Sequence, residues 1–292
     1  YSEDLKIDNQ IINYQIDSYR KIRNTLRFLL GNLNNFNKQN LVDPEEMPEL
    51  ERYLLTRISS LNEKLKELVS KHDYHAIYTA LLNFCTLELS AFYFDIRKDS
   101  LYCDDIKSIK RRSTSTCLHI IFEFLTKWLS PIVSFTCEEA WKSRSYSNEE
   151  SILLQNVKDD EFTYKDISLE KVFEELKRVR KSVTSALELK RNEKLIGSSL
   201  QAKVILFLSK DTQKIIADLD LAEMCIVSNV ETHDISSRSK ESISIEDEEI
   251  YVDIKLADGK KCERCWAVSQ EVSSSKNNLC NRCEDVWKSF QQ

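Results

Sequence analysis

Two pairs of closely spaced cysteines constrain the folding of this chain more than any other feature of its sequence. Each pair has the spacing Cys-x-x-Cys, fourteen residues separate the pairs, and the four members are Cys262, Cys265, Cys280 and Cys283. A two-residue turn brings both sulfur atoms of a pair to one point, and two such turns complete a tetrahedral shell around Zn²⁺. Because a closed shell of four thiolates leaves no position for water, the spacing predicts one structural zinc ion. For either pair taken alone, the alternatives are a redox dithiol or unrelated free cysteines.

The other five of the nine cysteines are scattered along the chain. Four of them have apolar or small neighbours, which is typical of core packing: Cys85, Cys117, Cys137 and Cys225. The sequence offers no explanation for Cys103, which follows Tyr102. An odd total with a single tight cluster indicates a reducing compartment rather than a disulfide framework, so we expect a cytoplasmic protein.

Composition excludes several classes of protein. The only glycines, Gly31, Gly197 and Gly259, are too far apart for a Rossmann or P-loop phosphate cradle, which needs glycines close together. No signal peptide is recognisable, and no apolar run approaches the roughly 20 residues that cross a bilayer, so no membrane partner is expected. A formal net charge of -6 argues against a protein that coats nucleic acid indiscriminately, although a local basic surface remains possible.

The first half of the chain has the apolar periodicity of helices. Apolar residues recur every three or four positions in the segments Ile12–Leu33, Pro44–Leu68, Tyr74–Arg97 and Arg112–Trp141, and we expect Pro131 to kink or end the last of these helices. Four helices joined by short polar breaks favour an antiparallel bundle, which we assign to residues 1–160.

The second half has a mixed pattern. A charged amphipathic helix is expected over Lys165–Lys194, followed by strands at Ala202–Leu208, Cys225–Val227 and Glu249–Leu256. These elements predict a small α/β junction module over residues 161–256. The cysteine pairs predict a zinc ribbon or knuckle module over residues 257–292. The fold class expected for the whole chain is mainly α.

A basic face is expected on the first helix. Arg20, Arg23 and Arg27 recur at i, i+3 and i+7 opposite the apolar stripe, and Asn24 lies at the edge of this face. Because arginine offers a planar fork to phosphates and bases, the face is a candidate nucleic-acid-binding surface. A solvated helix surface is the alternative. A weaker basic cluster, interleaved with acids, lies on the later helix and includes Arg178, Lys181, Arg191 and Lys194.

No catalytic residue is predicted in this chain. The histidines show neither ligand spacing with carboxylates nor a neighbouring nucleophile: His72, His75, His119 and His233. A zinc hydrolase would need an open coordination position and a general base near the cysteines, and the sequence offers neither.

A series of motifs along the chain follows the order found in one enzyme family. The motifs are Lys21-Ile-Arg-Asn-Thr-Leu-Arg-Phe-Leu-Leu-Gly-Asn-Leu33, Ser90-Ala-Phe-Tyr93, Leu101-Tyr-Cys-Asp104, Phe135-Thr-Cys-Glu-Glu-Ala-Trp141, Arg191-Asn-Glu-Lys-Leu-Ile-Gly-Ser-Ser-Leu200, and Lys261-Cys-Glu-Arg-Cys-Trp266 with Cys280-Asn-Arg-Cys283. Together they resemble the C-terminal part of bacterial-type isoleucyl-tRNA synthetases, which are class I enzymes. Related synthetases for valine, leucine and methionine share the helical bundle but not this ending.

The resemblance implies a tRNA-binding function. It implies an anticodon-binding bundle and a zinc module that bind the anticodon arm of isoleucine-accepting tRNA, for a monomeric ligase that attaches isoleucine using ATP. It implies RNA contacts at Arg20, Arg23, Asn24, Arg27, Arg178, Lys181, Arg191 and Lys194. The family's HIGH and KMSKS catalytic motifs and its editing domain are absent from these residues. The chain is therefore expected to work together with the catalytic and editing domains of a longer enzyme.

One alternative from a different functional class remains open. A helical protein-interaction scaffold with a structural zinc ribbon would contain the same bundle and the same cysteine spacing. It would bind protein rather than RNA, and it predicts an exposed apolar patch and no salt-dependent binding of tRNA.

Overall fold

The chain divides into two compact units in its computed structural model, which describes residues 7–145, 150–155, 163–239, 242–244 and 249–289. One unit comprises Tyr1–Leu101 with Lys107–Lys165, and the other comprises Tyr102–Ile106 with Asp166–Gln292. The predicted boundary between residues 160 and 161 lies outside the described residues. The predicted boundary between residues 256 and 257 lies within the second unit and stays a prediction.

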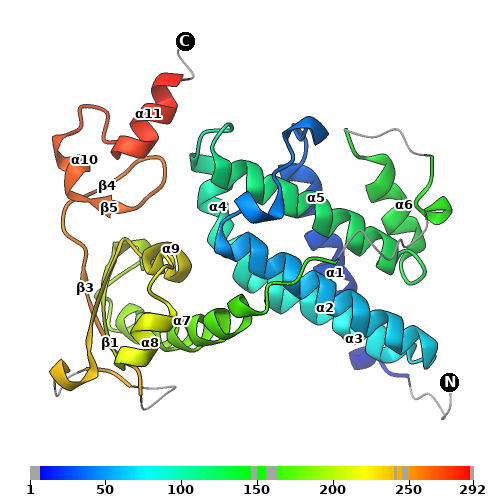
Figure 1. Cartoon of the computed structure of the whole chain (residues 1–292), viewed down its shortest axis with the longest axis horizontal. Helices are drawn as coiled ribbons and strands as arrows, with labels where there is room; N and C mark the ends of the chain where they lie inside the picture. The colour runs from blue at the N-terminus through cyan, green and yellow to red at the C-terminus, as the bar shows by residue number, and fades with distance from the viewer. Residues whose placement is uncertain (1–6, 146–149, 156–162, 240–241, 245–248, 290–292) are drawn as a thin grey trace. The chain divides into compact units, whose positions relative to one another are not determined.

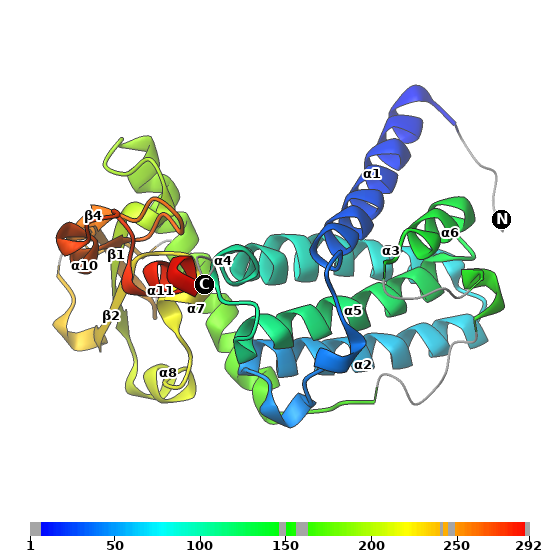
Figure 2. The ribbon, with the colours of Figure 1, turned by 90° about the horizontal axis from the view of Figure 1, so that it is seen from above.

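The first unit is a bundle of helices, as the apolar periodicity predicts (Figure 1). Its main elements are α1 (Asn9–Asn32), α2 (Glu49–Ser70), α3 (Tyr74–Asn83), η3 (Phe84–Tyr93), α4 (Phe94–Cys103), α5 (Ile109–Leu129) and α6 (Ser134–Lys142), with short turns η1 (Lys38–Asn40), η2 (Pro44–Glu46) and η4 (Ile152–Leu154). Figure 2 shows α2, α3 and α5 running side by side while α1 crosses them. The ring of Phe122 in α5 stacks on that of Trp141 in α6, with centroids 6.4 Å apart, and so fixes α6 to the bundle.

Prolines mark two of the helix boundaries. α5 ends at Leu129, and α6 begins at Ser134 beyond Pro131, as predicted. α2 begins at Glu49, directly after Pro48, rather than after Pro44 as the periodicity suggested. Pro44 instead opens the 3-10 turn η2. Proline is tolerated at these positions because the amide that it lacks has no partner at the start of a helix.

The helix predicted over Tyr74–Arg97 is continuous, but its middle is wider than an α-helix. η3 is π-helical, and Ser90 Oγ donates a hydrogen bond of 2.8 Å to the carbonyl of Cys85, five residues earlier. The span Tyr74–Cys103 could cross a membrane by length and composition alone, but 50% of its most apolar window is buried inside the protein. Such burial is typical of a core helix in a globular domain, and the absence of a membrane partner stays a prediction.

The second unit combines a small sheet with helices. Its elements are α7 (Ser168–Asn192), η6 (Ser199–Gln201), β1 (Ala202–Leu208), α8 (Lys210–Ile215), α9 (Leu221–Cys225), β2 (Asn229–Asp234), η7 (Ile235–Ser237), β3 (Tyr251–Leu256), β4 (Lys260–Lys261), β5 (Val268–Ser269), α10 (Gln270–Ser274) and α11 (Asn281–Ser289). The larger sheet has the order β2-β1-β3, in which β1 is parallel to β2 and antiparallel to β3. β4 and β5 form a separate antiparallel ladder next to the cysteine pairs.

The strand predicted at Cys225–Val227 is wrong. Cys225 ends α9, and Ile226 closes that helix with a left-handed φ of 56°. The apolar triplet serves the core at a helix end, since Cys225 and Val227 are 6% and 5% exposed. The true strand, β2, is an edge strand of mostly polar, largely exposed residues, so no apolar alternation marks it in the sequence.

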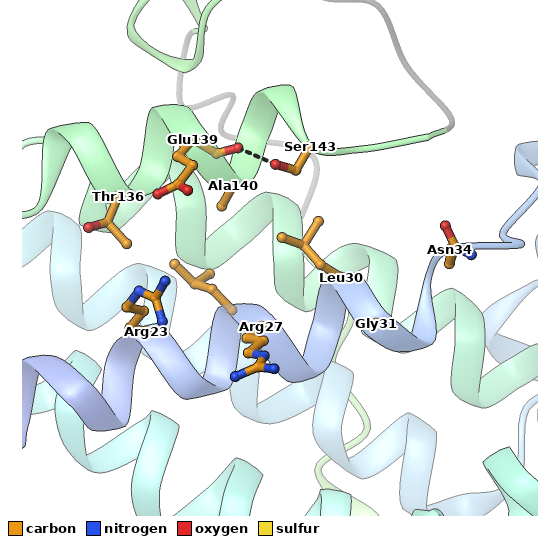
Figure 3. Close-up of a pocket in the computed structure, with 10 residues that line it drawn as sticks. Arg23, Arg27, Leu30, Gly31, Asn34, Thr136, Glu139, Ala140 and Ser143 are labelled. Atoms are coloured by element: carbon orange, nitrogen blue, oxygen red, sulfur yellow. Dashed lines mark hydrogen bonds between the residues drawn. The ribbon is translucent and has the colours of Figure 1, made fainter.

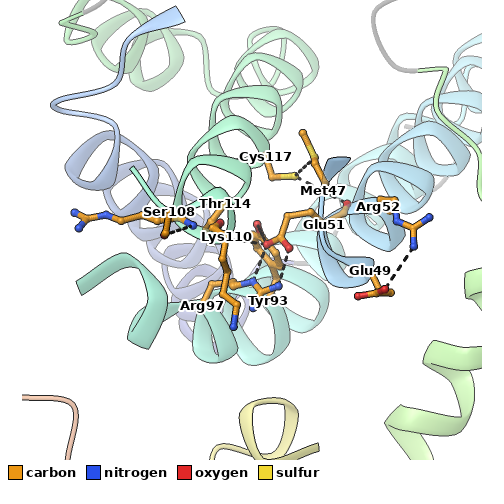
Figure 4. Close-up of polar contacts among 11 residues, drawn as sticks. Met47, Glu49, Glu51, Arg52, Tyr93, Arg97, Ser108, Lys110, Thr114 and Cys117 are labelled. Carbon is orange, nitrogen blue, oxygen red and sulfur yellow. Dashed lines mark hydrogen bonds and ion pairs between the residues drawn. The ribbon is translucent and has the colours of Figure 1, made fainter. Parts of the chain in front are cut away.

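A buried ion pair joins the helices of the bundle. Glu51 of α2 and Arg97 of α4 are 0% and 1% exposed, and the carboxylate accepts hydrogen bonds of 2.6 Å from both Nε and Nη2 of Arg97. The same carboxylate accepts the hydroxyls of Tyr93 at 3.0 Å and of Thr114 at 3.2 Å (Figure 4). Burial raises the pKa of Tyr93 well above its usual value, and the charge of Glu51 adds to this effect, so the phenol remains a donor.

Replacing Glu51 by alanine should strongly destabilise the first unit. The change removes the carboxylate that accepts two hydrogen bonds from the buried Arg97 guanidinium, so we expect the free energy of unfolding to fall by about 3–5 kcal/mol. The matched control is Glu49→Ala, which breaks a partly exposed pair with Arg52 at 3.7 Å and should cost less than about 1 kcal/mol. Urea titrations followed by helical circular dichroism measure both effects, and equal losses in the two variants would contradict the prediction.

Candidate metal centre and nucleic-acid interface

The four cysteines of the two pairs lie together in the second unit. Their sulfur atoms are all within 4.8 Å of one another, and all four residues are buried. The Sγ atoms of Cys265 and Cys280 are 3.7 Å apart. A tetrahedron with Zn–S bonds of about 2.3 Å has sulfur atoms about 3.8 Å apart, so the cluster fits one zinc ion with four thiolate ligands. Because such a shell is closed, its role is structural.

Backbone turns bring the two cysteine pairs together. The first pair lies between β4 and β5, where the Cys262 amide donates to the carbonyl of Ala267 at 2.8 Å. The Cys280 amide donates to Cys262 Sγ at 3.4 Å and so links the second turn to the first. Gly259 has a φ of +115°, and a Cβ there would lie 2.2 Å from the carbonyl oxygen of Ser269. Only glycine therefore allows this close approach of β4 to β5.

The thiol pKa values show why the cluster needs a cation. Burial raises the pKa of Cys265 to about 12 and that of Cys283 well above its ordinary value. Burial also acts to raise the pKa of Cys262, but backbone N–H donors around its sulfur outweigh this effect and lower the pKa to about 7. Two of these thiols would therefore keep their protons at neutral pH without a counter-charge. A zinc ion supplies that charge and stabilises the thiolate form of its ligands.

A fifth buried cysteine lies against the cluster. Cys103 is 6% exposed and belongs to the same buried group as the four ligands. Arg264, inside the first cysteine turn, donates to the Cys103 carbonyl at 2.6 Å, and Arg282, inside the second turn, pairs with Asp104 at 3.0 Å. These arginines anchor the segment Tyr102–Ile106, which groups with the second unit. Sequence reasoning missed these contacts because no local pattern marks residues 161 positions apart.

The basic residues predicted on the first helix are all exposed on α1, but their environments differ. Arg20 pairs with Asp17 at 3.2 Å. Arg23 and Arg27 have no ion-pair partner in the part of the chain that the structure describes, and both line a groove between α1 and α6 (Figure 3). Asn24 is exposed nearby without lining this groove.

The groove between α1 and α6 has a volume of about 550 Å³, within the range of small-molecule sites. Its other lining residues are Leu26, Leu30, Gly31 and Asn34 from the side of α1 and Thr136, Glu139, Ala140 and Ser143 from the side of α6. A hydrogen bond of 2.9 Å between the hydroxyls of Tyr19 and Thr136 ties the two helices together. Helical spacing alone could not predict the groove, because it depends on how distant segments pack.

The basic residues predicted on the later helix lie on or next to α7, in the second unit. Arg178 and Arg191 each form an ion pair with the glutamate three residues before it. Lys181 and Lys194 are exposed, and Lys194 follows the end of the helix with a left-handed φ of 61°. Neighbouring acids therefore offset part of this positive charge, and the least compensated arginines among the predicted contacts are Arg23 and Arg27.

Two family models match the chain. Residues 51–206 match the anticodon-binding domain of tRNA ligase, and residues 259–286 match the zinc finger found in FPG and IleRS.

Curated relatives match along nearly the whole chain. The isoleucine–tRNA ligase of Pelagibacter ubique is 44% identical over 92% of this chain, which is 29% of the ligase. Those of Ruegeria pomeroyi and Desulforamulus reducens are 37% and 35% identical over 97% and 99% of this chain, covering 30% and 32% of their own lengths. The chain thus spans about a third of the length of these relatives.

Removing one sulfur ligand should release the metal and unfold the module around it. For Cys265→Ala we expect zinc to fall from about one ion per chain to a small fraction of that, because the closed shell is broken. Amides of residues 259–286 should then lose protection from hydrogen exchange, whereas those of α2 and α5 should keep theirs. Cys225→Ala, a buried cysteine of the same unit outside the cluster, is the control. Elemental analysis showing full zinc content in Cys265→Ala would contradict the assignment.

Proposed function

Because the chain belongs to the isoleucine–tRNA ligase family through its anticodon-binding domain and its zinc finger, we propose that it binds the anticodon arm of an isoleucine-accepting tRNA. In this proposal it serves a ligase that attaches isoleucine to that tRNA using ATP. The chemistry would take place in catalytic and editing domains outside these 292 residues, which would be its partners within the enzyme.

The arginine pair on α1 carries this proposal. Arg23 and Arg27 are exposed, are one turn apart, lie next to a groove and have no acidic partner among the described residues. An exposed guanidinium without a counter-charge remains available to phosphate oxygens and base edges. Because single-stranded loops expose both groups, an anticodon loop suits this surface better than a regular RNA duplex does.

Other residues of the chain would contribute less. Asp17 offsets part of the charge of Arg20, and glutamates offset part of the charge of Arg178 and Arg191. We propose that these residues, together with Asn24, Lys181 and Lys194, support the anticodon arm through weaker contacts. The zinc-binding module would provide a rigid surface beside it.

The cellular setting is also part of the proposal. None of the nine cysteines forms a disulfide in the structure, which fits a reducing compartment such as the cytoplasm. The ligase would act there as a monomer.

Removing the two unpaired arginines should weaken RNA binding and reduce its dependence on salt. For the double variant Arg23→Ala with Arg27→Ala, we expect roughly tenfold weaker binding of an anticodon stem-loop with the sequence GAU. The slope of log affinity against log salt should shrink by about 1 to 2. With fewer phosphate contacts, RNA binding releases fewer counterions. Fluorescence anisotropy of a labelled stem-loop at several salt concentrations measures both quantities.

Two controls make this experiment decisive. Lys21→Ala removes one exposed positive charge from α1 outside the groove and should change the affinity by less than about twofold. A stem-loop with another anticodon should bind more weakly than GAU to the unaltered chain. If the double variant bound both stem-loops as the unaltered chain does, the protein-interaction scaffold would be the better interpretation.

A further inference from the structure

The groove between α1 and α6 presents opposite charges that do not neutralise each other. Figure 3 shows Arg23 of α1 pointing toward Thr136 and Glu139 of α6, with Arg27 further along α1. Glu139 is exposed, and no ion pair joins it to Arg23, Arg27 or any other described residue. The groove therefore contains cationic donors, Arg23 and Arg27, and an anionic acceptor, Glu139, that do not contact each other.

The groove also has an apolar lining that suits a planar ring. Leu26 and Ala140 are 2% and 6% exposed and contribute apolar surface, together with Leu30. Gly31 adds no side chain, and a Cβ at this position would have no neighbour within 4 Å. A flat base can thus contact apolar side chains while its edges reach the polar groups around it.

Among the four bases, guanine matches this arrangement of charges best. Its O6 and N7 accept hydrogen bonds, and an arginine fork can donate to both. Its N1–H and N2 amino group donate, and an ionised carboxylate only accepts. Uracil would place a carbonyl oxygen against Glu139, cytosine lacks the N7 acceptor, and adenine offers Arg23 only one acceptor on the edge that guanine uses.

Resting on the proposed function, we propose that this groove binds one guanine nucleotide turned out of the anticodon loop. The O6 and N7 edge of the base lies on Arg23, its N1–H and N2 amino group lie on Glu139, and a phosphate of the loop lies on Arg27. Glu139 is then a specificity-determining residue, since it increases the affinity for a base that has an amino group at this edge.

Base analogues test this inference directly. The stem-loop is prepared with GAU, with inosine in place of the guanine, which removes the N2 amino group, and with purine in place of the adenine, which removes the N6 amino group. Each loop is titrated against the zinc-loaded 292-residue chain, against Glu139→Ala and against Glu46→Ala. Glu46 is an exposed acid away from the groove, and it controls for the change in net charge.

We expect inosine to bind the unaltered chain and Glu46→Ala about tenfold more weakly than guanine does, because a hydrogen bond to a charged group is lost. In Glu139→Ala the two loops should bind within about twofold of each other. Loss of a negative charge raises attraction for every loop equally, so the ratio between loops isolates the contact with the amino group. The purine loop should give the same ratio to GAU in all three proteins.

Three results would overturn the inference, and they differ in whether the proposed function also fails. If inosine and guanine loops bind equally, or if the purine loop is the one that depends on Glu139, the guanine assignment fails while the arginine effects on binding still support the proposed function. If the arginine double variant binds RNA normally, both fail together. Helical circular dichroism and zinc content are measured on Glu139→Ala to check its fold, and we expect both to be unchanged because the position is helical and exposed and accepts alanine.

Discussion

The buried charge of Glu51 is the constraint on which the bundle depends. A buried carboxylate needs hydrogen-bond donors for its oxygens. Here they are the phenol of Tyr93 in η3, the guanidinium of Arg97 in α4 and the hydroxyl of Thr114 in α5. Because these donors lie on separate segments, α2 cannot slide or rotate against them without leaving a charge unpaired. α5, fixed in this way, holds α6 through the stacked rings of Phe122 and Trp141, and α6 forms one side of the groove.

The second unit must also stabilise buried negative charge, and it does so with a metal ion rather than with hydrogen-bond donors. Its four buried thiols become ligands only as thiolates, and in the described part of the chain no network of donors comparable to that around Glu51 surrounds all four. A metal ion supplies the positive charge from outside the sequence, so a segment too short for its own core gains its folding energy from binding. The arginines inside the cysteine turns, Arg264 and Arg282, bind the segment around Cys103 and Asp104.

The sequence predicted those features that depend on residues close together in the chain. The zinc ligands were predictable because both turns repeat one short spacing, and the helices because each buries one stripe of a regular period. β2 escaped prediction because its residues face solvent, and the apolar triplet before it belongs to a helix end. The role of Cys103 and the α1–α6 groove escaped because both depend on residues more than 100 positions apart. Local patterns thus located most of the helices and strands and the cysteine cluster, but not the contacts between distant segments.

The arginines of α1 differ in their proposed function because their neighbouring residues differ, although their spacing in the sequence is regular. Arg20, Arg23 and Arg27 have the same chemistry and share one helical face, yet within the described ranges an ion pair forms only at Arg20, with Asp17. Gly31 also depends on its surroundings for its explanation. Glycine within a helix lowers helix stability by about 1 kcal/mol relative to alanine, and no neighbour of Gly31 requires so small a residue. Gly31 lines the groove, so a larger residue at this position would add a side chain to the groove wall. This cost in helix stability is accounted for if the proposed ligand needs the open groove. Arg23 and Arg27, which have no ion-pair partner among the described residues, would then face the negative charge of that ligand.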